Sequence, residues 1–356
     1  IPYTEEYLNA DAPEYAQYPA AEGELIFNAT EVETEFLESP ANPQPWMQKA
    51  VAEHRRRTEA AQQSKEGNLT VEDFVSMKND AELGWLWGRR VVMFSDSVDR
   101  YMTQFFCEEF DGEITFPVQD ESGRFSKGIC DVPAFNLTLV YLHSTGSFTY
   151  KPKWWWKPKI KYVAWEERWE KLWKPHESPI QGEKGRPDLI LWQSGLWDQR
   201  AFWESGEANH EKDVYPMGTR VRQLVWQEVR FTAARLRKFV GRIALEFPKS
   251  PTMFRSMTIH RVSDAGDATI YDLDRLSRAI AEKAGHEVFE WGRIITSLSM
   301  LYKDKTHPGR GPASWLWADM VLEYLARGGG AGDEQRKPYF DSWDACHPQL
   351  MNWGGR

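Results

Sequence analysis

The sequence is poor in net positive charge, in long apolar runs and in cysteine. Its 44 Lys and Arg residues are outnumbered by 53 Asp and Glu, which gives a formal net charge of −9, whereas general nucleic-acid binders are usually basic. No stretch approaches the roughly eighteen consecutive apolar residues of a transmembrane helix. We therefore expect no nucleic-acid partner and no membrane span within this sequence, and we find no internal repeat.

Only three cysteines occur, at positions 107, 130 and 346. A disulfide between Cys107 and Cys130 would close a modest loop and stabilise the fold by about 3 kcal/mol. Cys346 would then be left over as a free thiol. The alternative is three reduced thiols in a cytosolic protein.

Three Asn-X-Ser/Thr triplets begin at Asn28, Asn68 and Asn136. Such triplets also arise by chance, and Asn136 is the weakest because it opens an apolar, strand-like run. Together with the cysteines they favour a secretory-pathway glycoprotein, secreted or in the Golgi lumen. A leader or anchor that precedes Ile1 is compatible with this expectation.

Aromatic residues make up 14% of the chain, and 18 of them are Trp. They serve either as large core side chains or as a surface on which sugar rings pack. The basic, aromatic segment 151–159 contains two prolines, which exclude a helix there. After it, Trp165, Trp169 and Trp173 form a stripe at helical spacing. This stripe either docks on the body of the protein, lines a glycan site or contacts a membrane surface.

The chain of 356 residues is long enough for one large α/β domain or two small ones. We expect an extended arm and a helix over 1–80, a catalytic domain over 81–327 and an irregular tail over 328–356. Short apolar runs predict strands at 90–94, 136–142, 188–193, 252–259 and 286–291. Helical periodicity marks 45–64, 98–106, 165–173, 216–244, 271–284 and 313–327. This alternation predicts a three-layer fold, a mainly parallel sheet flanked by helices, with ligands beyond the carboxyl ends of the strands.

Ser97 directly follows the first predicted strand and begins a helix. This is a favourable place for a nucleophile, because a helix N-terminus offers free N–H groups and partial positive charge to an oxyanion. A serine hydroxyl also needs a base at neutral pH. The simpler interpretation is that Ser95, Asp96 or Ser97 only caps the helix.

His307 is the best candidate for that base. Asp304 lies three residues before it and can fix the imidazole tautomer and stabilise the imidazolium. Taken alone, the pair is more typical of a surface loop.

Four short blocks together resemble one superfamily. Residues Phe94-Ser95-Asp96-Ser97 resemble the Gly-Asp-Ser block of the GDSL/SGNH hydrolases, and Asp304-Lys305-Thr306-His307 resembles their Asp-X-X-His block. Gln193-Ser194-Gly195-Leu196-Trp197-Asp198 and Phe254-Arg255-Ser256-Met257-Thr258-Ile259-His260 are similar to two segments of the PC-esterase branch. That branch includes plant trichome-birefringence-like polysaccharide O-acetyltransferases. The resemblance implies a flavodoxin-like SGNH hydrolase fold.

The resemblance also implies roles for individual residues. Ser97 would be the nucleophile, His307 the base and Asp304 its orienting acid. The backbone N–H groups of Ser97 and Gly146 and the side chain of Gln193 would form the oxyanion hole. The sequence departs from the superfamily in having Gln193 where an asparagine is usual.

Three further residues are expected near the substrate: Arg255, His260 and Trp197. The alternative for Arg255 is a structural ion pair, and for His260 a core or surface position. Ser95 replaces the glycine of the Gly-Asp-Ser block, which is a second departure. His143, at a strand end, is a further candidate to line the cleft.

These observations predict a serine-dependent O-acyl esterase that removes acetyl groups from a polysaccharide or oligosaccharide, with no cofactor and no metal. The same triad would serve a polysaccharide O-acetyltransferase, in which a sugar hydroxyl replaces water as the acceptor. The Ser95 and Gln193 departures and the abundance of Trp leave a catalytically silent glycan-binding protein as a further alternative. A membrane-surface scaffold that uses residues 151–175 is the weakest one.

Overall fold

The computed structural model describes residues 45–63, 65, 67–79, 82–117, 125–174, 180, 185–208, 223–261 and 267–328. All of them belong to one compact unit, Pro45–Pro338. The predicted arm over 1–43, the tail beyond 328, the Asn28 triplet and Cys346 lie outside these residues.

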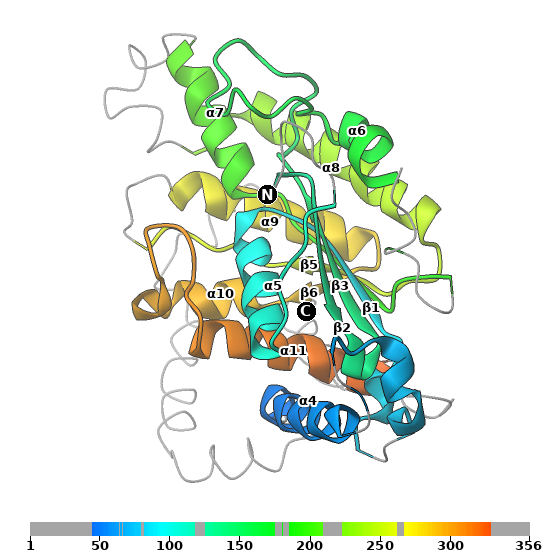
Figure 1. Cartoon of the computed structure of the whole chain (residues 1–356). Helices are drawn as coiled ribbons and strands as arrows, with labels where there is room; N and C mark the ends of the chain where they lie inside the picture. Colours follow the sequence, from blue (N-terminus) through cyan, green and yellow to red (C-terminus); the bar gives the residue numbers. More distant parts are fainter. Residues whose placement is uncertain are drawn as a thin grey trace, which may run out of the picture. The chain divides into compact units, whose positions relative to one another are not determined.

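A six-stranded sheet forms the centre of the described unit (Figure 1). Its strands run in the spatial order β2-β3-β1-β4-β5-β6, and every neighbouring pair is parallel except the edge pair β2–β3. The strands are β1 (Arg90–Ser95), β2 (Lys127–Val132), β3 (Leu137–His143), β4 (Leu189–Trp192), β5 (Thr252–Arg255) and β6 (Glu287–Phe289). The predicted α/β fold with a mainly parallel sheet is therefore confirmed.

Helices cover both faces of this sheet (Figure 1). One face carries α6, α8 and α9, and the other carries α5 and α11, with α4 packed on α11. The α-helices are α4 (Trp46–Gln62), α5 (Ser97–Glu109), α6 (Trp165–Arg168), α7 (Leu196–Ala208), α8 (Trp226–Glu246), α9 (Asp267–Lys283), α10 (Trp291–Thr296) and α11 (Pro312–Gly328). Helix α6 continues as a π-helix, η5 (Trp169–Trp173), and short 3₁₀ turns lie at η1 (Val71–Met77), η2 (Gly84–Leu86), η4 (Pro133–Phe135) and η8 (Ser299–Leu301).

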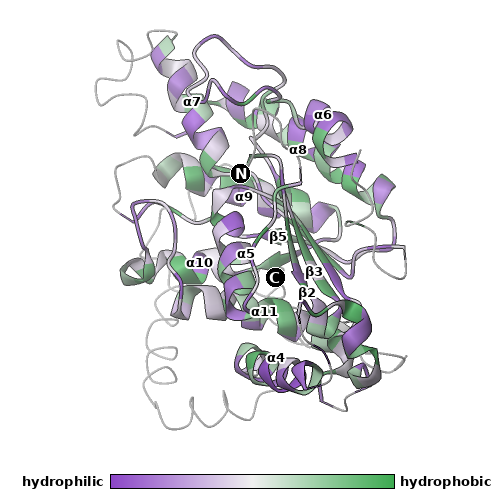
Figure 2. Cartoon of the chain, in the orientation of Figure 1, coloured by the Kyte–Doolittle hydropathy of each residue, from purple (hydrophilic) through white to green (hydrophobic). Residues whose placement is uncertain are grey.

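The tryptophan stripe of α6 and η5 lies in the core rather than on the surface. Trp165, Trp169 and Trp173 are all buried, and Phe94 of β1 stacks on Trp169 with ring centroids 5.3 Å apart. Successive strand residues point to opposite faces, and Met93 accordingly faces α5 instead. The interpretation that the stripe docks on the body of the protein is confirmed, and Figure 2 shows the hydrophobic strands that it covers.

The Cys107–Cys130 disulfide is present. It joins the last turn of α5 to the edge strand β2, across a Cα–Cα distance of 5.7 Å. The helix that begins with Ser97 is therefore covalently anchored to the sheet at its other end. The alternative of reduced thiols at Cys107 and Cys130 is therefore not found in the structure.

The antiparallel edge strand β2 and helices α7 and α10 were not expected from the sequence. Strand β2 reads Lys-Gly-Ile-Cys-Asp-Val, a mixed pattern that gains its order by pairing with β3. The strand expected over 252–259 ends at Arg255, where its parallel partner β6 also ends at Phe289. The Ser256 N–H makes the last hydrogen bond of this pair, to the Phe289 carbonyl at 3.0 Å. The helix expected from residue 216 begins at Trp226 among the described residues.

Candidate active site

Ser97 lies at the junction of the central strand β1 and helix α5. Asp96 caps this helix, since its carboxylate accepts the Val98 N–H at 2.8 Å. The capping role therefore falls on Asp96, and the Ser97 hydroxyl is free for another contact. Its Oγ lies 2.8 Å from Nε2 of His307, although 210 residues separate the two in sequence.

His307 stands in a tight loop that its own neighbours hold in place. The Lys303 N–H donates to the His307 carbonyl at 2.9 Å, and the backbone N–H of His307 donates to Asp304 at 2.8 Å. Both oxygens of Asp304 lie 3.0 Å from Nδ1 of the imidazole. With Nδ1 donating to the carboxylate, Nε2 is left as an acceptor for the proton of Ser97.

The electrostatics of this group suit a base that is neutral at physiological pH. Burial lowers the pKa of His307 below its ordinary value, and hydrogen bonding to Asp304 opposes this only in part. Burial would raise the pKa of Asp304, but the N–H groups of Thr306 and His307 donate to it and lower the pKa overall. The carboxylate therefore stays ionised while the imidazole stays neutral.

A cavity of about 310 Å³ opens over these residues. Both Ser97 and His307 line it, so the hydroxyl and its base are accessible from one space. The remaining lining residues are Arg100, Tyr101, Phe125, Trp156, Lys157, Leu196, Trp197, Gln199, Arg200, Trp203, His260 and Thr306. They come from α5, from the residues just before β2, from the basic aromatic segment 151–159, from α7 and from the segments after β5 and before α11.

Two of the predicted substrate residues lie in this cavity. Trp197 packs edge-on against the buried His143, with ring centroids 4.9 Å apart. His260 lies 3.1 Å from the Thr306 hydroxyl through Nδ1. His143 itself is buried beneath the cavity wall, where its Nδ1 contacts the Tyr141 hydroxyl.

Gln193 directly follows β4, the neighbour of β1. Its backbone N–H donates to the Phe94 carbonyl at 3.0 Å, which places it beside the end of β1. The side chain is 1% exposed, and among the described residues its Nε2 has no hydrogen-bond partner. Buried polar groups are rarely left unpaired, so this amide is an available donor beside the end of β1. Gln193, like Gly146, is not among the described residues that line the cavity of Ser97.

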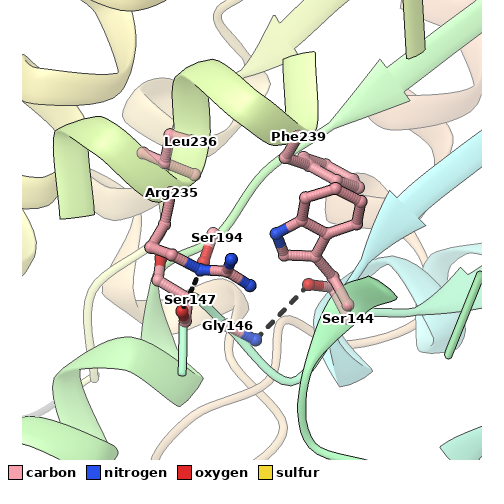
Figure 3. A pocket seen from close by; sticks show the side chains of 8 residues that line it. Ser144, Gly146, Ser147, Ser194, Arg235, Leu236 and Phe239 are labelled. Carbon is pink, nitrogen blue, oxygen red and sulfur yellow. Dashed lines mark hydrogen bonds between the residues drawn. The ribbon is translucent and has the colours of Figure 1, made fainter. Parts of the chain in front are cut away.

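Gly146 does not line the cavity that holds Ser97. It lies in a small enclosed space under α8, and its N–H donates to the Ser144 hydroxyl at 3.4 Å (Figure 3). This position requires a glycine for two reasons. Its backbone is left-handed (φ 95°), and a Cβ would lie 2.4 Å from Oδ1 of Asp198. The structure therefore gives Gly146 a packing role and does not place it as an oxyanion donor.

Arg255 is also displaced from its expected role. It is 1% exposed and donates twice to Asp99 of α5, at 2.6 and 3.0 Å. The structural ion pair weighed from the sequence is the arrangement found. Arg255 thus braces the first turn of the helix that presents Ser97 and does not reach the cavity.

Several cavity residues were missed from the sequence. Arg100 and Tyr101 follow Ser97 by three and four positions on α5, and helical spacing alone could have placed them on the same face. Trp156 and Lys157 belong to the basic aromatic segment 151–159, for which the sequence only excluded a helix. Trp203 lies on α7, a helix that the sequence did not indicate.

No protein-family model matches the chain, and no curated protein is similar enough in sequence to count as a match. Some solved structures are distantly similar. Acetylxylan esterase Axe2 from Geobacillus stearothermophilus is 12% identical over 67% of this chain and 94% of that chain, with a TM-score of 0.39. A protein described as a GDSL-like lipase from Parabacteroides merdae is 10% identical over 67% and 95%, with a TM-score of 0.38. The lipase/acylhydrolase from Enterococcus faecalis is 13% identical over 67% and 96%, with a TM-score of 0.36.

These TM-scores are too low to carry weight, so fold and site rest on the topology and distances given above. Within the described ranges, no group of His, Cys, Asp and Glu has the arrangement of a metal site. Among the same residues, no helix combines the length and apolarity needed to cross a membrane.

Proposed function

We propose that this protein is a serine esterase of the SGNH type that acts on O-acetyl groups of a carbohydrate. One observation carries the proposal: a continuous hydrogen-bonded series runs from Asp304 through His307 to the Ser97 hydroxyl. It ends in an open cavity, with distances of 3.0 and 2.8 Å. This is the order of contacts that activates a serine nucleophile.

The first half of the reaction forms an acyl-serine. His307 takes the Ser97 proton at Nε2 as Oγ attacks the ester carbonyl, and Asp304 stabilises the imidazolium that results. The imidazolium then returns the proton to the departing sugar oxygen. In the second half His307 deprotonates water, which attacks the acyl-serine. The bond from the acyl carbon to Ser97 Oγ then breaks, the imidazolium returns the proton to Oγ, and the carboxylic acid leaves.

The developing oxyanion needs donors that are already in place. Ser97 is the first residue of α5, so its N–H is one of the free donors at a helix N-terminus. We assign the unpaired Nε2 of Gln193 as a second donor. Removing one such donor elsewhere costs about 10²–10³ in kcat, so Gln193→Ala should lower the rate by roughly that factor.

The cavity wall supports a carbohydrate as the acyl carrier. Trp156, Trp197 and Trp203 lie around the triad, and Trp156 and Trp197 have ring centroids 5.3 Å apart. Indole faces of this kind pack well against sugar rings.

The experiment compares wild type with Ser97→Ala, and with Ser299→Ala as a matched control on an exposed 3₁₀ turn. Acetate release from an aryl acetate should fall at least about 10³-fold in Ser97→Ala and stay unchanged in the control. A fluorophosphonate should add its mass to Ser97 of the wild type and of the control, and should leave Ser97→Ala unmodified. Equal hydrolysis by wild type and Ser97→Ala would refute the proposal.

A second experiment identifies the group that accepts the acetyl from the acyl-serine, water or a sugar hydroxyl. It is needed because the same triad would serve an O-acetyltransferase of the PC-esterase branch. An aryl acetate and an unacetylated oligosaccharide are supplied together, and products are examined by mass spectrometry. We expect free acetate and no acetylated sugar. An added acetyl group would identify a transferase and replace the esterase assignment.

The proposed setting is the secretory pathway. The Cys107–Cys130 disulfide supports it, since such bonds persist in oxidising compartments. Asn68 is exposed and available for glycosylation. Expression in a glycosylating host, followed by glycosidase treatment, should reduce the mass if Asn68 carries a glycan.

A further inference from the structure

The charge of the candidate active-site cavity is opposite to that of the whole chain. The chain carries a net charge of −9, yet among the described residues that line the cavity Arg100, Lys157 and Arg200 are basic and none is Asp or Glu. Lys303 lies just outside, with its Nζ 3.1 Å from the centroid of the Tyr101 ring. A cavity lined by charges of one sign attracts ligands of the other sign.

Arg100 differs from the other buried arginines of the described residues. Those are each bound to carboxylate or carbonyl oxygens, as a buried charge requires. The pairs are Arg57 with Glu53, Arg89 with Asp188, Arg168 with the carbonyls of Phe125, His143 and Tyr162, Arg235 with Glu166, and Arg255 with Asp99. Arg100 is 6% exposed, and across the described ranges its side chain has no carboxylate or carbonyl acceptor.

The surroundings of Arg100 explain why it is left without an acid. Its guanidinium lies over the Tyr101 ring, 4.2 Å from the centroid, and its Nε is buried without a partner. The two acids near the start of the same helix are engaged elsewhere: Asp96 caps the helix and Asp99 binds Arg255. The charge therefore faces the cavity, and no carboxylate of the described residues is in contact with it.

The position of Arg100 relates this charge to the reaction. Ser97 and Arg100 are three residues apart on α5, and such residues share one helix face with Cβ atoms about 5–6 Å apart. An anion bound by Arg100 would thus lie beside the sugar whose ester reaches Ser97. Lys157 and Arg200 follow in the cavity wall. Arg200 lies 5.9 Å from the centroid of the Trp156 ring and is ion-paired with Glu204 on its own helix, so its charge is already compensated.

We propose that the substrate is an acidic glycan, in which a carboxylate or sulfate on the sugar binds Arg100 while an acyl ester of the same chain reaches Ser97. This inference rests on the proposed esterase function and deepens it. A guanidinium matches a planar carboxylate with two parallel hydrogen bonds, so we expect a uronate to be preferred to a sulfate. Lys157 would contact an acidic group of a neighbouring sugar.

The test compares acetylated oligogalacturonide with the same oligosaccharide after methyl esterification, which removes the charge and keeps the acetyl groups. Wild type should show a kcat/KM about 10-fold to 100-fold higher for the acid form, the scale of one charge-assisted pair. Salt should reduce this preference. A sulfated, acetylated oligosaccharide and its desulfated form provide the second arm, which separates sulfate from carboxylate.

Three variants assign the preference to one residue. In Arg100→Gln the ratio of the two kcat/KM values should approach one, and Arg100→Lys should restore part of it. Arg230→Gln, an exposed arginine on α8 outside the cavity, should keep the wild-type ratio. Circular dichroism would establish that Arg100→Gln is folded.

Several outcomes would overturn the inference. The inference is refuted if the wild type cleaves the charged and neutral forms equally well, or if Arg100→Gln keeps the wild-type ratio of kcat/KM values. In either case the Ser97-dependent hydrolysis of the aryl acetate would still support the esterase function. If no glycan is hydrolysed, calorimetry on Ser97→Ala decides. Tighter binding of the acid than of its methyl ester supports the inference, and equal or absent binding refutes it.

Discussion

Replacing Gly146 by Ala is a sharp test of how the loop after β3 is built. Gly146 has φ 95°, and a Cβ placed there would lie 2.4 Å from Oδ1 and 2.8 Å from Cγ of Asp198. The carboxylate cannot move aside freely, because it accepts the Ser147 N–H at 2.6 Å, the Ser147 hydroxyl at 3.1 Å and the Ser194 hydroxyl. An alanine at this position must therefore disrupt a fully buried carboxylate.

The size of the effect follows from two contributions. A left-handed backbone conformation costs a non-glycine residue about 1–2 kcal/mol. Weakening one hydrogen bond to the buried Asp198 carboxylate costs about 1–3 kcal/mol more. Gly146→Ala should thus lower the free energy of unfolding by about 2–5 kcal/mol, a large part of the stability of a typical domain.

The matched control is Gly241→Ala on α8. This glycine is exposed, and no heavy atom lies within 4 Å of its added Cβ. Because glycine disfavours helix interiors, the substitution should stabilise the protein by about 0.5–1 kcal/mol. The two Gly→Ala changes are therefore expected to have opposite signs.

Urea titration followed by tryptophan fluorescence measures both variants against wild type. The midpoint of Gly146→Ala should fall and that of Gly241→Ala should rise slightly, with similar slopes. If Gly146→Ala unfolds at the wild-type midpoint, the carboxylate network around residue 146 is not what holds this loop, and the geometric reasoning fails.

The remaining predictions concern the triad, the brace behind it and the disulfide. Because burial lowers the pKa of His307 and the base must be neutral, kcat/KM should fall only as the pH drops below about 6.5; an acid limb centred well above that value would contradict this. Asp304→Asn should shift the limb to lower pH, since the group that raises the imidazole pKa is removed, and should reduce kcat by about 10²–10⁴; an unchanged kcat would exclude it as the orienting acid. Arg255→Met should destabilise the protein by about 3–5 kcal/mol in thermal unfolding by leaving Asp99 buried and uncompensated, and adding Asp99→Leu should restore most of the loss; no recovery in the double variant would mean that the ion pair is not the cause. Cys107→Ser should cost about 3 kcal/mol in urea unfolding, and a wild type whose midpoint does not respond to dithiothreitol would refute that.

Much of the strand pattern could be predicted because buried parallel strands are short apolar runs. Strands β1, β3 and β4 lie within a residue of the expected ranges. The edge strand β2 could not be predicted from the sequence, because it contains Lys127 and Asp131 and is ordered by pairing with β3. Helix α7 was missed for a related reason, since its apolar residues serve both the core and the cavity.

For the site, the sequence alone determined which residue types stand where strands end, and the order of the blocks connected Ser97, Asp304 and His307. Proximity along the chain was enough for Asp304, which lies three residues from its histidine. Proximity along the chain could not predict the contacts of residues whose partners come from distant elements. Gly146 faces Asp198, a residue 52 positions later, and Arg255 meets Asp99 across 156 positions.

The tertiary structure alone decided which charges are paired. A sequence shows that an arginine is present, but only packing shows whether an acid reaches it. Arg255 looked like a substrate residue and is a buried brace, whereas Arg100 carried no signal beyond its helical spacing and is the buried arginine that faces the cavity without an acid. The difference arises because desolvation and pairing depend on neighbours in space, and those neighbours are set by how the helices fold back over the ends of the strands.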